Sequence, residues 1–127
     1  MDKPHKKLNV WQVSMQLTKE VYILTNDYPG DERFGLTQQT RRSVVSIPSN
    51  IAEGAARQGK REFRNFLSIA QGSLSELDTQ LEIAVNLGYL SSEQYVKISE
   101  KMISVDKMLT SLIRSLTKDF SEKGGRR

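Results

Sequence analysis

The side chains with the most chemically versatile groups form a polar row along one predicted helix. Spacings of three and four residues place the members of this row on one helical face: Ser46, Ser49, Asn50 and Glu53. Another helix, predicted over residues 60–87, carries Ser73 and Glu76, which could face the row. Carboxylates that meet between helices can begin a dinuclear metal site, whereas the hydroxyl and amide groups suit a buried hydrogen-bond network.

The rest of the sequence does not complete such a metal site. Dinuclear carboxylate sites of helical bundles also use a Glu-x-x-His motif from each of two helices. The chain has one histidine, His5 near its N-terminus, and no cysteine, which also argues against a Ser-His-acid triad and a thiolate site. We therefore expect a structural network, in which Asn50 and Glu53 satisfy backbone groups or fix the register of two helices.

Cationic side chains form a second candidate site. Residues 41–64 contain six basic and two acidic residues, a net charge of +4 that equals the excess of the whole chain. Lys60 and Arg61 would begin a helix, where the helix dipole disfavours a cation by about 0.3–1 kcal/mol. A solvated charged face is one explanation, and contact with nucleic acid or an acidic partner is the other. The candidate contact residues are Arg41, Arg42, Lys60, Arg61 and Arg64.

The apolar periodicity predicts four helices and no strand. They cover residues 9–28, 37–57, 60–87 and 92–119. The third has an unbroken alternation of four- and three-residue spacings, which is typical of a helical bundle. Gly88 is the expected stop of that helix, and Ser91 with Gln94 fits a capping box for the next. Because the connections are short, we expect one all-α domain over residues 8–120, an up-down-up-down antiparallel four-helix bundle.

Pro48 lies inside the second predicted helix. It removes the hydrogen bond to the Val44 carbonyl and introduces a ring clash, at a cost of about 3 kcal/mol. The sequence therefore predicts a kink in this helix at Pro48, which either wraps the helix around the core or frees a carbonyl for a site.

The two ends of the chain are polar. We expect residues 1–7 to be a flexible basic segment and residues 121–127 a disordered tail. The start of the chain leads into no apolar block of the signal-peptide kind, and no apolar run approaches the roughly 20 residues of a membrane span. We therefore expect a cytoplasmic protein without membrane contact.

Several motifs together resemble one protein family. They are Trp11-Gln12, Tyr28-Pro29, Phe34-Gly35-Leu36-Thr37, Arg41-Arg42, Ser46-Ile47-Pro48-Ser49-Asn50-Ile51-Ala52-Glu53-Gly54, Glu62-Phe63, Ala70-Gln71-Gly72-Ser73-Leu74-Ser75-Glu76-Leu77 and Leu87-Gly88-Tyr89-Leu90. The chain resembles, from about Leu8 to Leu90, the four-helix-bundle proteins encoded by intervening sequences in bacterial 23S rRNA genes. It also resembles the related accessory proteins of diversity-generating retroelements.

The resemblance implies a bundle that assembles into a ring, a homopentamer, and it implies no catalytic residue and no cofactor. In the retroelement branch, the ring binds a reverse transcriptase and nucleic acid through a basic surface. Carried over to this chain, those contacts correspond to Arg41, Arg42, Lys60, Arg61 and Arg64.

Three functional hypotheses follow. The favoured one is a non-enzymatic, oligomeric helical bundle that binds RNA or an RNA-handling protein through its basic surface. The alternative is a protein–protein adaptor that uses the acidic second half of the third helix and a broad apolar face, without any nucleic acid. The least favoured is a metal-dependent enzyme built on Glu53 and Glu76.

Overall fold

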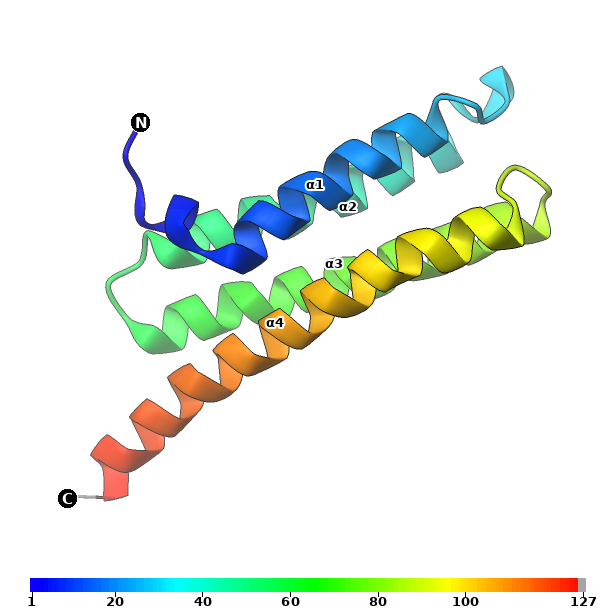
Figure 1. Cartoon of the computed structure of the whole chain (residues 1–127). Helices are drawn as coiled ribbons and strands as arrows, with labels where there is room; N and C mark the ends of the chain where they lie inside the picture. Colours follow the sequence, from blue (N-terminus) through cyan, green and yellow to red (C-terminus); the bar gives the residue numbers. More distant parts are fainter. Residues whose placement is uncertain (126–127) are drawn as a thin grey trace.

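Four α-helices make up most of the computed structural model, which describes the backbone of residues 1–125 and the side chains of residues 1–118. The helices are α1 (Asn9–Thr25), α2 (Leu36–Ala55), α3 (Lys60–Asn86) and α4 (Ser92–Gly125) (Figure 1). Two short 3-10 turns, η1 (Pro4–Lys7) and η2 (Gly30–Glu32), precede α1 and α2. This described part of the chain contains no strand, and none of its helices is long and apolar enough to cross a bilayer.

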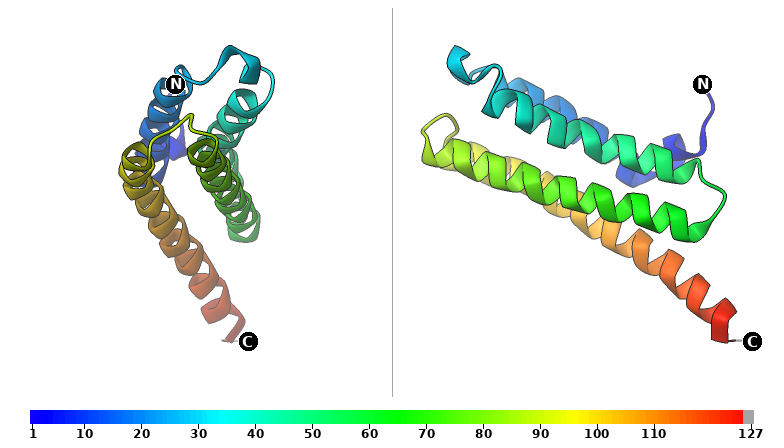
Figure 2. Two further views of the ribbon diagram at one scale, coloured as in Figure 1. Left: turned by 90° about the vertical axis from the view of Figure 1, so that its right-hand side faces the viewer. Right: turned by 180° about the vertical axis from the view of Figure 1, so that it is seen from behind.

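The helices form the predicted up-down-up-down bundle. Each helix packs against its neighbour in the sequence, and α1 closes the arrangement by packing against α4. A view turned by 90° shows α1 beside α2 and α4 beside α3 (Figure 2, left). The C-terminal half of α4 diverges from the other three helices and projects beyond them (Figure 2, right).

The apolar seams of the four helices meet in one core. Its fully buried large side chains include Leu17 of α1, Ile47 and Ile51 of α2, Leu67, Leu77 and Leu81 of α3, and Leu109 of α4. Burial of a side chain of this size contributes about 1.5–3 kcal/mol. The seam predicted for the third helix is therefore the strip of α3 that faces the core.

Local signals end α3 and begin α4 as predicted. Gly88 has a φ of +79°, and the amide of Tyr89 donates to the Ala84 carbonyl at 2.9 Å, which is the geometry of a Schellman cap. The Gln94 amide donates to Ser91 Oγ at 3.0 Å, and the Ser91 amide donates to Gln94 Oε1 at 2.9 Å. This reciprocal pair is the capping box at the start of α4.

Pro48 is buried inside α2, and the helix continues on both sides of it. The carbonyl of Val44, which has lost its usual helical donor, lies 3.4 Å from Thr18 Oγ1 of α1. The same hydroxyl donates to the Ser14 carbonyl at 2.8 Å. A neighbouring helix thus brings a donor to the carbonyl that proline frees, while the kink itself stays a prediction.

Both ends of the chain contain local structure. Residues 4–7 form the 3-10 turn η1, Gln12 Nε2 donates to the Lys6 carbonyl at 2.9 Å, and the His5 ring packs edge-on against Trp11 at 4.9 Å between centroids. The flexibility expected of residues 1–7 stays a prediction. At the other end, α4 continues to Gly125, whereas the sequence predicted an end near residue 119 and a disordered tail over 121–127. No proline interrupts this stretch, so the helix can propagate. Residues 126–127 and the side chains from 119 onward lie outside the described residues.

Candidate nucleic-acid interface

The structure divides the five predicted cationic contacts into two groups at opposite ends of the bundle. Lys60, Arg61 and Arg64 occupy the first turns of α3, whereas Arg41 and Arg42 lie in the first half of α2. Since the two helices are antiparallel, Arg42 is separated from the end of α2 by 13 residues, or about 20 Å of helix. The five side chains therefore do not form one continuous patch.

The first group belongs to a basic end of the molecule, where α2 connects to α3. We define this basic end as Lys6, Lys7, Lys60, Arg61 and Arg64, since η1 lies beside the α2–α3 connection (Figure 1). Lys60 and Arg61 are exposed, and the half-buried Arg64 lies 3.4 Å from Thr117 Oγ1 of α4. A cation at the start of a helix opposes the helix dipole, so the dipole does not favour lysine or arginine at these positions.

The nearby Arg57 has a structural role instead. Its guanidinium pairs with Glu53 one turn earlier at 3.3 Å and lies over the Phe66 ring at 5.0 Å from the centroid. Arg57 therefore joins the end of α2 to the start of α3 without any external ligand.

Arg41 is also used within the fold. Its Nε donates to Thr25 Oγ1 at 2.9 Å and its Nη2 donates to Asn26 Oδ1 at 3.0 Å. The guanidinium lies over the Tyr22 ring, 4.5 Å from its centroid, and Nη2 is 3.4 Å from the Tyr22 carbonyl. A cation beside the last turn of α1 is favoured by the helix dipole. Arg41 thus connects α2 to α1, and all of these partners are neutral groups.

Arg42, by contrast, is exposed and makes no hydrogen bond or ion pair with the described residues. It borders a groove of about 550 Å³ between α1, α2 and their connection. We call this the arginine–aromatic groove, and its lining residues are Tyr22, Arg33, Phe34, Thr37, Gln38, Arg41, Arg42, Val45 and Ser46. No described carboxylate lines it, so three arginines give it a positive potential.

Sequence reasoning missed two residues of this groove, Arg33 and Phe34. The Phe34 side chain is 80% exposed, and the Arg33 guanidinium lies 5.5 Å from its ring centroid. Both residues lie in the connection between α1 and α2, outside every helical seam. An aromatic side chain beside an arginine, with no place in an apolar repeat, is the signal that could have identified them.

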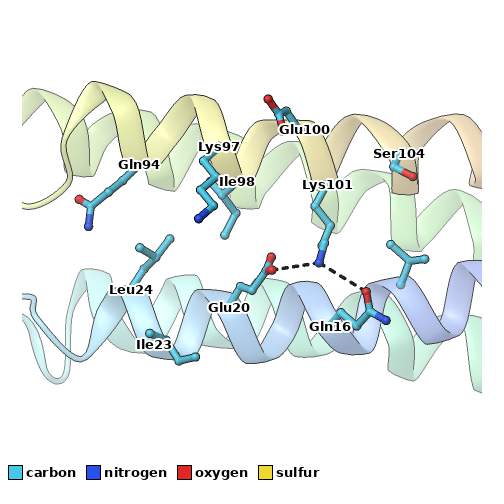
Figure 3. Close-up of a pocket in the computed structure, with 11 residues that line it drawn as sticks. Gln16, Glu20, Ile23, Leu24, Gln94, Lys97, Ile98, Glu100, Lys101 and Ser104 are labelled. Atoms are coloured by element: carbon cyan, nitrogen blue, oxygen red, sulfur yellow. Dashed lines mark hydrogen bonds and ion pairs between the residues drawn. The ribbon is translucent and has the colours of Figure 1, made fainter.

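A larger groove of about 750 Å³ lies between α1 and α4 (Figure 3). Its lining carries charges of both signs, and Lys101 Nζ pairs with Glu20 at 2.9 Å. Lys101 Nζ also lies 3.4 Å from Gln16 Oε1, as the dashed lines in Figure 3 show. Because its best-placed cation is already neutralised, this groove is a poorer site for an anion than the arginine–aromatic groove.

The polar row divides into a half-buried, hydrogen-bonded part and an exposed part. Ser46 Oγ lies 2.8 Å from Ser73 Oγ across α2 and α3, and Asn50 Nδ2 donates to Ser46 Oγ at 2.9 Å and to the Ser46 carbonyl at 2.8 Å. The other members, Ser49, Glu53 and Glu76, are exposed and outside this network. Asn50 therefore caps a carbonyl of its own turn rather than the one freed by Pro48.

The carboxylates do not converge. Glu53 pairs with Arg57, and Glu76 is exposed on α3. Among the described side chains, no three potential metal ligands lie together. The geometry of Glu53 and Glu76 thus gives no support to the metal-enzyme hypothesis.

Three tyrosines have raised pKa values, and all three are structural. Burial raises the pKa of Tyr28 to about 12, and the Glu32 carboxylate that accepts from the Tyr89 hydroxyl at 3.0 Å raises the pKa of Tyr89. The Asp78 carboxylate raises the pKa of Tyr95 in the same way through a hydrogen bond between α3 and α4. These groups stay protonated near neutral pH and contribute no charge to either basic region.

Comparison with known proteins places this fold in a family. A solved structure from Bacteroides thetaiotaomicron VPI-5482, described as a protein of unknown function from the S23 ribosomal protein family, superposes with a TM-score of 0.73 and 28% identity. The match covers 82% of this chain and 97% of that chain. Among curated proteins, none matches this sequence. A family model described as 23S rRNA-intervening sequence protein matches residues 6–111, which include both cationic groups and the polar row. This chain therefore belongs to the 23S rRNA-intervening sequence protein family.

Proposed function

We propose that this protein is a non-enzymatic, oligomeric helical bundle of the cytoplasm that binds RNA through its basic end. The observation that carries the proposal is the position of Lys60 and Arg61, which are exposed at the start of α3, where the helix dipole opposes them. Arg64 extends the same end by one turn, and η1, which carries Lys6 and Lys7, packs against α2. Phosphate groups are the ligands that such a cluster would attract.

Gel retardation of an rRNA-like RNA at low salt tests this proposal. The triple variant Lys60→Glu, Arg61→Glu and Arg64→Glu should abolish retardation and keep the far-ultraviolet circular dichroism of the wild type. The log-log salt slope of the wild type should correspond to a few phosphates, about 0.9 for each duplex contact.

A matched control separates local charge from net charge. Lys19, Lys97 and Lys107 are exposed on α1 and α4, away from the basic end, and their triple change to Glu alters the net charge equally. This control should retain most of the retardation. Full retention of affinity by the variant of the basic end would refute the assignment of the site.

We further propose that the protein is a homo-oligomer, in the form of the pentameric ring that the family resemblance implies. Support comes from large apolar side chains that are more than 40% exposed on α3, on its C-terminal cap and on α4: Ile69, Ile83, Leu87, Val96 and Ile103. Extra apolar surface of this kind is typical of an interface between subunits. Light scattering should give about 72 kDa, five times the 14.4 kDa chain, and a monomer would contradict the ring.

The same apolar side chains favour a second candidate function, a protein–protein adaptor. In that case a partner protein covers α3 and α4, and RNA has no role. Capture of a partner that persists after nuclease treatment, and that an Ile103→Asp change removes, would favour the adaptor over the RNA-binding function.

A further inference from the structure

We propose that the arginine–aromatic groove binds unpaired nucleotides of RNA, with a base stacked on Phe34 and a phosphate held by Arg33 and Arg42. The inference rests on the proposed RNA-binding function and adds a second site, at the other end of the bundle from Lys60 and Arg61. It identifies the ligand as single-stranded, because a duplex keeps its bases stacked inside and cannot offer one to a protein ring.

The first support is the exposure of Phe34. The ring is 80% exposed, and the apolar core of the described residues does not include it. The Arg33 guanidinium lies 5.5 Å from the ring centroid, and the 80% exposure of the side chain leaves most of the ring surface open to solvent. Stacking of a base on such a ring is worth about 1–3 kcal/mol, and it depends little on which base it is.

The second support is the charge around the ring. Arg33, Arg41 and Arg42 line the groove, and no described carboxylate does. The carboxylate nearest in sequence, Glu32, is engaged elsewhere, since its Oε1 accepts from the Leu36 amide at 3.2 Å and its Oε2 from the Tyr89 hydroxyl at 3.0 Å. Arg42 makes no bond to the described residues, so it can bind a phosphate without giving up an internal contact.

The third support is the shape of the groove and the nature of its remaining side chains. Its volume of about 550 Å³ lies within the usual range for small-ligand sites, roughly 300–1,000 Å³. The exposed amide of Gln38 offers both a donor and an acceptor to the edge of a base. Tyr22, 40% exposed, adds a second aromatic ring that Arg41 backs from one side.

Fluorescence anisotropy with a labelled 12-nucleotide oligo(U) and with an RNA duplex of equal length tests the proposal. Phe34→Ala should weaken binding of the single strand by roughly 5- to 150-fold, which corresponds to the loss of one stacked base, and should leave the salt slope unchanged. Phe34→Trp should restore affinity because it restores the stacking surface. Neither change should affect duplex binding by more than about twofold.

Arg42→Ala tests the phosphate contact separately. It should weaken binding of oligo(U) and lower the log-log salt slope by about 0.7, the value for one contact on a single strand. The matched controls are Lys107→Ala on α4, which removes an exposed cation, and Met15→Ala on α1, which removes an exposed apolar side chain. Both controls should bind oligo(U) like the wild type.

The outcomes distinguish this inference from the proposed function. If Phe34→Ala binds oligo(U) as tightly as the wild type while the triple change at Lys60, Arg61 and Arg64 still abolishes RNA binding, the groove assignment is wrong and the function stands. If the wild type binds no RNA, both fail. If Phe34→Ala lowers the oligomer mass in light scattering, a second copy of the chain is the occupant, and the inference is overturned.

Discussion

Arg41 and Arg42 are adjacent residues of the same type on α2, but they have different roles. Arg41 reaches back to the last turn of α1 and makes its contacts there, whereas Arg42 makes none with the described residues. A helix turns by 100° per residue, so neighbours in sequence point in different directions. Only the packing of α1 against α2 reveals which arginine is available to a ligand.

This difference predicts unequal effects of the two substitutions on the free energy of unfolding. Arg41→Ala should lower the free energy of unfolding by about 1–3 kcal/mol, because it removes hydrogen bonds and a cation–π contact at a helix end. Arg42→Ala should change it by less than about 0.5 kcal/mol. Urea denaturation followed by circular dichroism measures both, and equal effects of the two substitutions would contradict the role given to Arg41.

The buried Tyr28 hydroxyl predicts how the folding stability of the protein changes at alkaline pH. Its hydroxyl is buried without a partner among the described residues, and burial raises its pKa to about 12 from the ordinary value of 10. The folded state therefore favours the protonated form of Tyr28. The contribution of this preference to the free energy of unfolding is fully present below pH 10 and is lost as the pH rises from 10 to 12.

A Tyr28→Phe variant should consequently lose less stability than the wild type over that interval, by up to about 2.7 kcal/mol for a pKa difference of 2. At neutral pH it should be at least as stable as the wild type, since it removes an unsatisfied hydroxyl. Chemical denaturation at pH 8, 10 and 11 measures this difference, and parallel losses in the two proteins would exclude Tyr28 as the titrating group.

At the scale of the helices, the sequence is most informative where the signal is local. The seam of α3, the Schellman cap at Gly88 and the capping box of Ser91 and Gln94 each depend on residues within one or two turns. The connection between α1 and α2 has no periodicity, so Arg33 and Phe34 gave no helical pattern to interpret. Likewise, the donor that meets the Val44 carbonyl comes from Thr18, 26 residues away, and only tertiary packing brings it there.

The packing of α2 against α3 predicts different effects on stability for alanine substitutions at two glycines. A Cβ on Gly54 would lie 2.8 Å from Phe66 Cβ and 3.2 Å from the Phe63 carbonyl, so Gly54→Ala should destabilise the protein by about 1–3 kcal/mol. A Cβ on Gly72, in the same helix pair, would meet nothing within 4 Å. Gly72→Ala should therefore stabilise it by about 0.5–1 kcal/mol, and melting temperatures that shift in the same direction would contradict this picture.

At the scale of the whole molecule, the two cationic regions are separated by about 20 Å of helix. Substitutions that far apart, with no shared partner, usually have additive free energies. Combining Arg42→Ala with Lys60→Ala should thus weaken RNA binding by the product of the two separate factors. Anisotropy titrations of the four proteins measure this, and a strongly non-additive result would indicate that both cations contact one phosphate cluster.

The antiparallel order of the bundle brings its two irregular connections to the same end, and one carboxylate links them. Glu32 both receives the first amide of α2 and accepts the hydroxyl of Tyr89 from the α3–α4 turn. The segment that carries Arg33 and Phe34 is consequently held in place by Glu32 before RNA binds, which lowers the entropic cost of RNA binding. A Glu32→Gln protein keeps the shape of this side chain but loses its negative charge. It should show faster amide exchange in this segment and a shorter residence time for oligo(U), with Phe34 and the arginines of the groove unchanged.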